Sequence, residues 1–299
     1  MSYDRWYYHM VLDSLGTRKL FNNREEYVYG MNAVALAQYM YDVRIIQFDL
    51  MSNHAHFVVL ATGMSCLNFF YLIRAKINSR LVSDGYAPIP ADWFFRLFRL
   101  ETKEDLVNAV SYSARNPYDA INGHLPSGYL WSSSYMMFSD LTALIESRTV
   151  GETGIREMRR ILGSKTRLPD GYKVCKLGYV LPESYVMRVG GVPKAMTLYG
   201  DAKDYSYSIF KDYGTYRKTA SDFGEEWAPS GSDAKRLVSD LLNLCFGVKE
   251  AGKLDTGRKC DLAVMLGTRY GMPPAEIAGC TGLSPSAVSR LLYSYSKHK

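Results

Sequence analysis

The sequence contains no apolar run near the roughly 18 residues that a membrane span requires. Residues 1–18 also lack the apolar stretch of a secretory signal. These two absences predict a protein without membrane association that is located in the cytoplasm.

Closely spaced cysteines are also absent. The 5 cysteines are an odd number, and no two lie two or three residues apart, as a zinc or redox site would need. This spacing predicts buried, reduced thiols at Cys66, Cys175, Cys245, Cys260 and Cys280.

The chain has no strong excess of either charge, but its modest excess is unevenly distributed. Residues 1–150 contain 13 Lys and Arg against 14 Asp and Glu, whereas residues 151–229 contain 13 against 10 and residues 230–299 contain 10 against 6. The net charge of +6 therefore comes from the C-terminal half. Such an excess suits a polyanionic partner but is also common on solvated surfaces, so by itself it does not identify nucleic acid.

The hydrophobic content, 47%, is enough for two or three ordinary cores. Residue patterns in the first part of the chain predict strands at 6–12, 43–51, 54–60 and 94–100, and helices at 25–40, 65–82 and 103–115. Ser52-Asn53 is typical of a hairpin turn, and Asn116-Pro117 is expected to end the last helix. This order predicts an α+β fold in which helices pack on one face of a largely antiparallel sheet.

After Arg148 the composition shifts toward Gly, Tyr and basic residues, with a basic run of Arg156, Arg159, Arg160, Lys165 and Arg167. The pattern of this middle region does not indicate a fold. Residues 227–232 resemble a linker, and helical patterns then recur to the C-terminus. We therefore expect three regions: 1–148, 149–229 and 230–299.

His54 and His56 are separated by one residue on a predicted strand, so both imidazoles should project from the same face about 6–7 Å apart. That spacing lets two rings bind one metal ion, while Ala55, Phe57 and Val59 face a core. Alone, the pair is equally compatible with a structural or surface role. Imidazoles would also suit zinc, copper or iron, so the pair does not identify its metal.

Tyr112 lies on the helix predicted at 103–115, and Asn116 follows one turn later on the same face. A phenol hydroxyl and an amide oxygen could thus approach one metal site. Because a phenol has a pKa near 10, it needs a cation nearby to act as a nucleophile. Without further context, a simple packing role for one of 24 tyrosines is favoured.

Four short segments between residues 3 and 138 occur in a defined order. They are Tyr8-His9-Met10-Val11 followed by Leu20-Phe21, Met51-Ser52-Asn53-His54-Ala55-His56-Phe57-Val58-Val59, Tyr112-Ser113-Ala114-Arg115-Asn116-Pro117, and Leu130-Trp131-Ser132-Ser133-Ser134-Tyr135. Together they resemble the HUH single-strand transposases that use one catalytic tyrosine, most closely the REP-associated tyrosine transposases. Ser52, Ala55 and Ser113 depart from the family pattern without removing a catalytic group.

The resemblance implies a ferredoxin-like or RRM-like catalytic core in residues 1–148. It assigns His54 and His56 as metal ligands, Tyr112 as the nucleophile and Asn116 as a further metal ligand, with Mg²⁺ or Mn²⁺ as the cofactor. It also implies cleavage and rejoining of single-stranded DNA with hairpin or repeat ends through a 5′-phosphotyrosine. His9 could face the same site, although a packed strand histidine is favoured.

Residues 259–270, 274–280 and 284–295 show three helical patterns, with Gly282 in a turn and Ser284 as an N-cap. This C-terminal module resembles the helix-turn-helix domain of bacterial replication initiators. The resemblance implies duplex DNA binding by Ser286, Ser289 and Arg290. A helical cap without DNA contacts is the alternative.

Three hypotheses follow from these observations. The first is a DNA transesterase that acts in transposition or mobilisation of repeat elements, associated with the nucleoid. The second is a catalytically idle, domesticated DNA-binding regulator, and the third is a metal-dependent hydrolase of another class. The sequence leaves open whether the protein is a monomer or a homodimer.

Overall fold

The computed structural model describes residues 4–13, 19–90, 95–120, 125–210, 213–225, 229 and 231–297. These residues form two compact units. The first comprises the described residues up to 118 together with residues 125–210, and the second is built mainly from the described residues between 213 and 297. The predicted division into 1–148, 149–229 and 230–299 remains a prediction.

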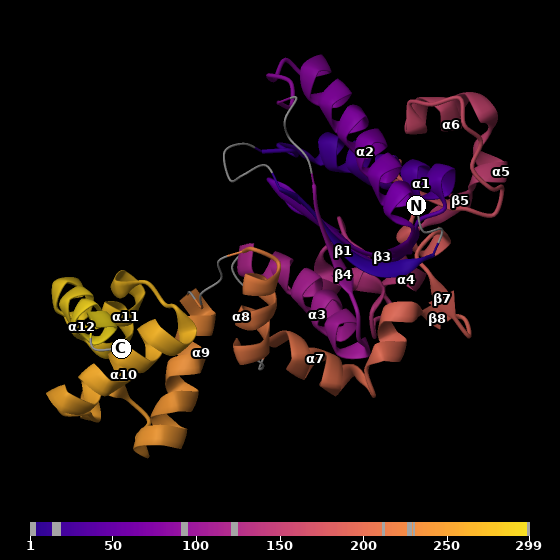
Figure 1. Cartoon of the computed structure of the whole chain (residues 1–299). Coiled ribbons are helices and arrows are strands. Elements are labelled where there is room, and N and C mark those ends of the chain that lie inside the picture. The colour runs from indigo at the N-terminus through magenta and orange to yellow at the C-terminus, as the bar shows by residue number, and fades with distance from the viewer. Residues whose placement is uncertain are drawn as a thin grey trace. The chain divides into compact units, whose positions relative to one another are not determined.

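A four-stranded antiparallel sheet lies at the centre of the first unit (Figure 1). Its spatial order is β2-β3-β1-β4, with β1 at Trp6–Asp13, β2 at Arg44–Leu50, β3 at His54–Ala61 and β4 at Arg96–Leu100. Helix α1 (Arg24–Tyr41) connects β1 to β2, and α2 (Gly63–Ser83) connects β3 to β4. This is the ferredoxin-like βαββαβ arrangement, so the predicted α+β class with an antiparallel sheet is confirmed.

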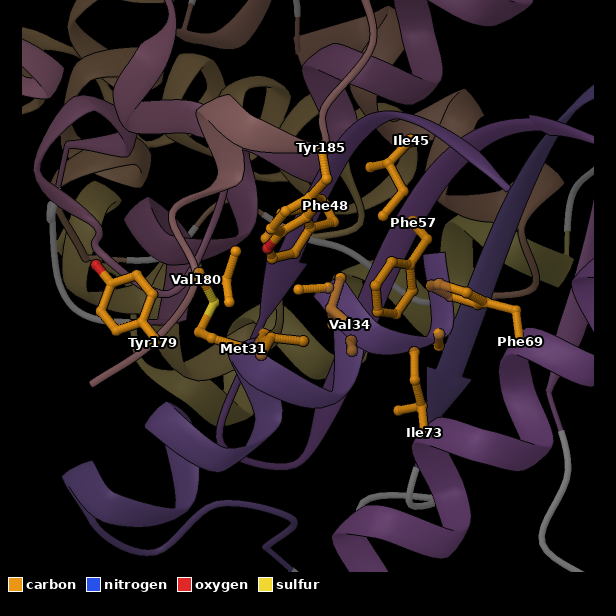
Figure 2. Packing of buried hydrophobic residues seen from close by; sticks show 14 of the residues in the cluster. Met31, Val34, Ile45, Phe48, Phe57, Phe69, Ile73, Tyr179, Val180 and Tyr185 are labelled. Carbon is orange, nitrogen blue, oxygen red and sulfur yellow. The ribbon is translucent and has the colours of Figure 1, made fainter. Parts of the chain in front are cut away.

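Helices α1 and α2 cover one face of this sheet, as Figure 2 shows for the packed side chains. Phe57 of β3 stacks on Phe48 of β2 with ring centroids 5.9 Å apart, and it meets Phe69 of α2 edge-on at 5.2 Å. Met31 and Val34 of α1 belong to the same buried cluster. Because strand side chains alternate, burial of Phe57 on this face turns His54 and His56 to the other face.

Helix α3 (Lys103–Ala120) lies on that other face. The Tyr112 ring meets the rings of His9 and His56 edge-on, and the Ser113 hydroxyl donates a hydrogen bond to Asp49 of β2. The expectation that helices pack on one face therefore holds for α1 and α2 but is wrong for α3. A helix that follows the last strand is free to fold back over the face that α1 and α2 leave open.

Asn116-Pro117 does not end α3, which continues to Ala120 with Pro117 inside it. A proline has no N–H, so the carbonyl of Ser113 loses its usual helical donor. The Asn116 amide nitrogen donates to the carbonyls of Ser113 (3.4 Å) and Tyr112 (3.0 Å). This side chain offsets the missing bond and lets the helix pass the proline.

Part of the middle region belongs to the sheet-containing unit. Tyr179, Val180 and Tyr185 join the core on the α1 side, where Tyr185 stacks on Phe48 at 6.2 Å (Figure 2). The elements from residue 141 to residue 210 are short: α4 (Leu141–Leu144), β5 (Ser147–Thr149), α5 (Val150–Thr153), α6 (Ile155–Leu162), β6 (Lys173–Cys175), β7 (Arg188–Val189), β8 (Val192–Pro193) and α7 (Ala202–Phe210). Their brevity explains why periodicity did not indicate a fold.

Helix α7 and the segment before it cover the outer side of α3. The Ser111 hydroxyl lies 2.7 Å from the Tyr199 hydroxyl and 2.6 Å from the Ser208 hydroxyl. The buried Arg115 guanidinium donates to the carbonyl of Ile209 at 2.5 Å. Helix α3 is therefore enclosed between the sheet and residues 199–209.

The second unit is all-helical. It contains α8 (Tyr213–Asp222), α9 (Gly231–Leu241), α10 (Thr256–Tyr270), α11 (Pro274–Thr281) and α12 (Pro285–Lys297). The Ser284 hydroxyl accepts a hydrogen bond from the Ala287 backbone N–H at 3.2 Å, which confirms the predicted N-cap. A Cβ on Gly267 would lie 2.5 Å from Leu292, so α10 and α12 approach closely only because that position is glycine. Positions 231 and 232 of the linker expected at 227–232 begin α9, so the prediction is wrong there, and positions 227, 228 and 230 lie outside the described residues.

All five cysteines are free, and Cys66 and Cys175 are buried as predicted. The prediction of burial is wrong for Cys245, which is exposed, and for Cys260 and Cys280, which are partly buried. These three belong to the small helical unit, which has less interior in which to bury a side chain. Among the described residues, no helix has the length and apolarity needed to span a bilayer.

Candidate active site on the α3 face of the sheet

The two strand histidines lie side by side beneath α3. The ring centroids of His54 and His56 are 4.9 Å apart, with the rings nearly perpendicular. Strand register places Asp49 of β2, His56 of β3, Val11 of β1 and Arg96 of β4 in one row across the sheet. The row brings together one potential metal ligand, one carboxyl group and one guanidinium from three strands, with Val11 of β1 between His56 and Arg96.

His56 is fully buried, and its Nδ1 lies 3.1 Å from Nε2 of His9, within hydrogen-bond distance. The Nε2 of His56 has no hydrogen-bond partner within the part of the chain that the structure describes. Burial, together with the charge of Arg96, lowers the pKa of His56 to about 3. The imidazole is therefore neutral, which is the form that binds metals, and one ring nitrogen is available for a ligand.

His54 is partly exposed, and its Nδ1 lies 2.8 Å from Oδ1 of Asn53 in the hairpin turn. A side-chain oxygen at this nitrogen orients the ring and favours Nε2 as the metal-binding atom. In both histidines, then, Nδ1 has a neighbour that holds the ring. This is the arrangement expected of paired imidazole ligands.

His9, which the sequence placed on the first strand as a packed residue, is fully buried. Its ring stacks on that of His56 with centroids 5.2 Å apart. Burial lowers the pKa of His9 well below its usual value, and the charges of His56 and Arg96 lower it further. His9 thus packs as expected, and it also contacts the proposed ligand His56 directly.

Tyr112 lies against this histidine group. Its ring centroid is 5.6 Å from that of His56 and 6.0 Å from that of His9, and the residue is 3% exposed. Asn116, one turn later, uses its amide nitrogen for the carbonyls within α3, which leaves its amide oxygen as the atom that could bind a metal. The structure therefore brings Tyr112 to the histidines.

Asp49 is a residue that the sequence analysis missed. It is fully buried, and it accepts hydrogen bonds from the hydroxyls of Ser113 (Oδ2) and Ser134 (Oδ1, 3.1 Å) and from the Gln47 amide (Oδ2, 3.3 Å). Burial raises the pKa of Asp49 to about 7, although these hydrogen bonds lower it. The signal that could have identified it was a carboxylic residue, together with Gln47, among the apolar residues of the strand at 45–50.

The segment Trp131-Ser132-Ser133-Ser134-Tyr135 packs along β2. The Leu50 N–H donates to the Trp131 carbonyl at 2.9 Å, and the Ser133 hydroxyl donates to Oε1 of Gln47 at 2.9 Å. Together with Ser134 and Asp49, these groups form a buried polar network. The network connects β2 to α3 through Ser113, and so fixes the helix that carries Tyr112.

The donor set fits a metal ion only in part. Among the described residues, no group of three or more His, Cys, Asp and Glu side chains could hold one. His54, His56 and the amide oxygen of Asn116 are the candidate ligands, and the buried Nε2 of His56 is the observation that supports them. Water or a substrate oxygen would have to complete the coordination.

In the second unit, Ser286, Ser289 and Arg290 are all exposed on α12. The Ser289 hydroxyl donates to the Pro285 carbonyl at 3.0 Å, and the hydroxyls of Ser284 and Ser286 are 3.2 Å apart. The three residues are accessible to a partner. They remain predicted DNA contacts.

No protein-family model matches the chain, and no curated protein matches it. A solved structure, of a REP-associated tyrosine transposase bound to a REP hairpin, is similar to this chain. The two share 13% sequence identity over 59% of this chain and 95% of that chain, with a TM-score of 0.34. A likeness at that level assigns no function to this chain.

Proposed function

We propose that this protein is a metal-dependent single-stranded DNA endonuclease and transesterase that acts in DNA transposition or in mobilisation of repeat elements. The observation that carries the proposal is the contact of the Tyr112 ring with His56, whose buried Nε2 is available to a ligand. The ring of His54 lies 4.9 Å from that of His56, and α3 supplies both the phenol and Asn116.

In the proposed reaction, the phenolic oxygen of Tyr112 attacks a DNA phosphorus. A bond forms between this oxygen and phosphorus, and the bond from phosphorus to the 3′ oxygen breaks. The phenol releases its proton to solvent, and the departing 3′ oxygen takes one up. The products are a 5′-phosphotyrosine and a free 3′-hydroxyl, and the reverse attack by a 3′-hydroxyl rejoins DNA without ATP.

His54, His56 and Asn116 would hold Mg²⁺ or Mn²⁺ beside the phenol. A divalent cation at that position supplies charge stabilisation for the scissile phosphate and for the phenolate. Arg96, whose charge already acts on His9 and His56, adds a fixed positive charge to the same face. The neutral state of the buried imidazoles keeps them competent to bind the cation at neutral pH.

The test is a covalent-adduct assay. The whole protein is incubated with Mg²⁺ or Mn²⁺ and 3′-end-labelled single strands that carry hairpins, and protein-linked label is resolved by denaturing electrophoresis. Wild-type protein should become labelled through the 5′ phosphate, and Tyr112→Phe should not. Tyr118→Phe, on the same helix, is the matched control and should retain labelling. Labelling of Tyr112→Phe would remove the nucleophile assignment.

A catalytically idle DNA-binding regulator is the second candidate function. The specific observation in its favour is the enclosure of the site, because Tyr112 is 3% exposed and His56 is 0% exposed. For the transesterase, α3 or its cover must move to admit a phosphate. Wild-type protein that binds hairpin DNA but never forms an adduct with any strand in the panel would favour the regulator.

A further inference from the structure

The basic run after Arg148 is not used by the proposed active site. Most of it lies on α6, an amphipathic helix whose Met158 and Leu162 are buried while Arg156, Arg159 and Arg160 are exposed. Helix α6 packs beside α1 (Figure 1), and α1 covers the sheet face opposite His54 and His56. These cations are therefore separated from the Tyr112 site by the thickness of the sheet.

A groove of about 460 Å³ lies between α1, α2, α6 and the turn after β6. Its charged lining consists of four cations from these four segments, Arg24, Arg80, Arg160 and Lys176, and one carboxylate, Glu25. Arg160 and Lys176 are exposed at their side chains by 82% and 73%. A second hollow of about 520 Å³ shares Arg160 and Lys176 and continues the groove past Arg148, although Glu146 and Glu157 balance the charge there.

Hydrogen bonds between the segments that line the groove fix their positions. The Asn32 amide of α1 donates to the Gly178 carbonyl at 2.9 Å and accepts from the Val180 N–H at 3.0 Å, which fixes the turn that carries Lys176. Lys76 of α2 donates to the carbonyls of Leu162 (3.0 Å) and Gly163 (2.6 Å) and so holds the end of α6. The cations of the groove therefore project from segments whose positions are already set.

We propose that this groove binds the sugar-phosphate backbone of the DNA on which the protein acts, at a site separate from the Tyr112 centre. A nucleic acid carries one negatively charged phosphate at every nucleotide, so several cations spread along one groove can each contact a different phosphate. A single small anion would need fewer cations than the four that line this groove. Arg160 and Lys176 are themselves exposed in their pairs with Glu157 and Glu146, so phosphates can compete for them. Arg80 is less accessible, because its guanidinium pairs with Asp84 at 2.6 Å. The identity of the partner as DNA rests on the proposed function.

The test compares two triple variants of the whole protein. Arg24→Gln, Arg160→Gln and Lys176→Gln together neutralise the groove, and Arg44→Gln, Arg188→Gln and Lys203→Gln remove the same charge from exposed positions elsewhere in the unit. Binding to a fluorescent hairpin-bearing single strand is measured by anisotropy over a range of salt concentrations. The groove variant should lose about tenfold or more in affinity at low salt, and its slope of log K against log salt should fall by roughly 2, near 0.7–0.9 per lost phosphate contact.

The control variant should bind within about twofold of wild type, since scattered surface charges contribute little. Equal binding by the two triple variants would overturn the groove proposal. Loss of binding to phosphatidylserine-containing vesicles by the groove variant, with DNA affinity unchanged, would also overturn it in favour of a membrane partner. Adduct formation is scored separately, so a wild-type protein that binds through the groove but never forms an adduct would reject the transesterase and retain the groove.

Discussion

Nε2 of His9 lies 3.1 Å from Nδ1 of His56, and the two rings stack with centroids 5.2 Å apart. Because this contact involves the Nδ1 of His56, the metal can be bound only by its Nε2. His9 is thus a positioning residue for the proposed ligand. Removal of such a partner typically lowers metal affinity 10- to 100-fold.

His9→Phe should keep the ring packing of β1 but remove the nitrogen beside His56. We expect the Mn²⁺ concentration that gives half-maximal adduct formation to rise about 10- to 100-fold, with a smaller change in labelling at saturating Mn²⁺. Met10→Ala, a buried truncation on the same strand whose side chain packs in the core on the opposite face, is the control and should cost stability without a shift in the Mn²⁺ midpoint. An unchanged midpoint in His9→Phe would assign His9 to packing alone.

Asp49 should make the stability of the protein depend on pH. Its folded pKa of about 7 lies above the usual value of 3.8, so the folded protein binds this proton more tightly than the unfolded chain. The contribution of Asp49 to stability is thus fully present below about pH 4 and is lost as the pH rises to about 7, by a few kcal/mol in order of magnitude.

Asp49→Asn removes this titration while it retains two polar atoms for the serine hydroxyls. Between about pH 5 and about pH 8, the wild-type protein should lose free energy of unfolding that the variant does not lose. The stability of the variant relative to wild type, measured by urea denaturation, should therefore rise with pH. The comparison cancels the opposite contribution of His9 and His56, whose lowered pKa values cost stability as the pH falls below about 6.5. A difference that stays constant across this range would contradict the prediction.

Asn116 should have two separable roles, one in α3 and one at the metal. Asn116→Ala removes the amide that serves the carbonyls of Tyr112 and Ser113, at a cost of about 1 kcal/mol, and it also removes the proposed ligand oxygen. Pro117→Ala added to Asn116→Ala returns a backbone N–H to the Ser113 carbonyl. The double variant should recover thermal stability but not Mn²⁺-dependent labelling. Recovery of both would show that Asn116 acts only within the helix.

Arg290 should contribute to duplex binding without affecting cleavage. Arg290→Ala is expected to weaken binding of double-stranded DNA by about 1–3 kcal/mol if it contacts a base edge, or to lower the salt slope by about 1 if it contacts a phosphate. Adduct formation on a single-stranded hairpin should stay within about twofold of wild type. Lys297→Gln, exposed at the end of the same helix, is the matched control. Unchanged duplex affinity in Arg290→Ala would favour a helical cap.

Local sequence patterns predicted every strand and helix of the βαββαβα core, because each spans enough residues for its period to show. The predicted strand at 54–60 matches β3 at His54–Ala61, and the helix at 25–40 matches α1 at Arg24–Tyr41. Prediction failed at Asn116-Pro117, since the rule that proline ends a helix takes no account of a side-chain amide that replaces the lost bond. It also failed in the middle region, where the elements up to α7 have only two to nine residues, too few for a period to show.

The sequence by itself determined that His54 and His56 share one face of a strand, because side chains alternate along any strand whatever surrounds it. It also determined that Asn116 lies one helical turn from Tyr112. Only the tertiary structure decided that α3 covers this face, that His9 contacts His56, that Asp49 is buried beneath Ser113, and that Arg24, Arg80, Arg160 and Lys176 line one groove. Each of these relations joins residues far apart in the chain, and such contacts are set by strand register and core packing, which no local period encodes.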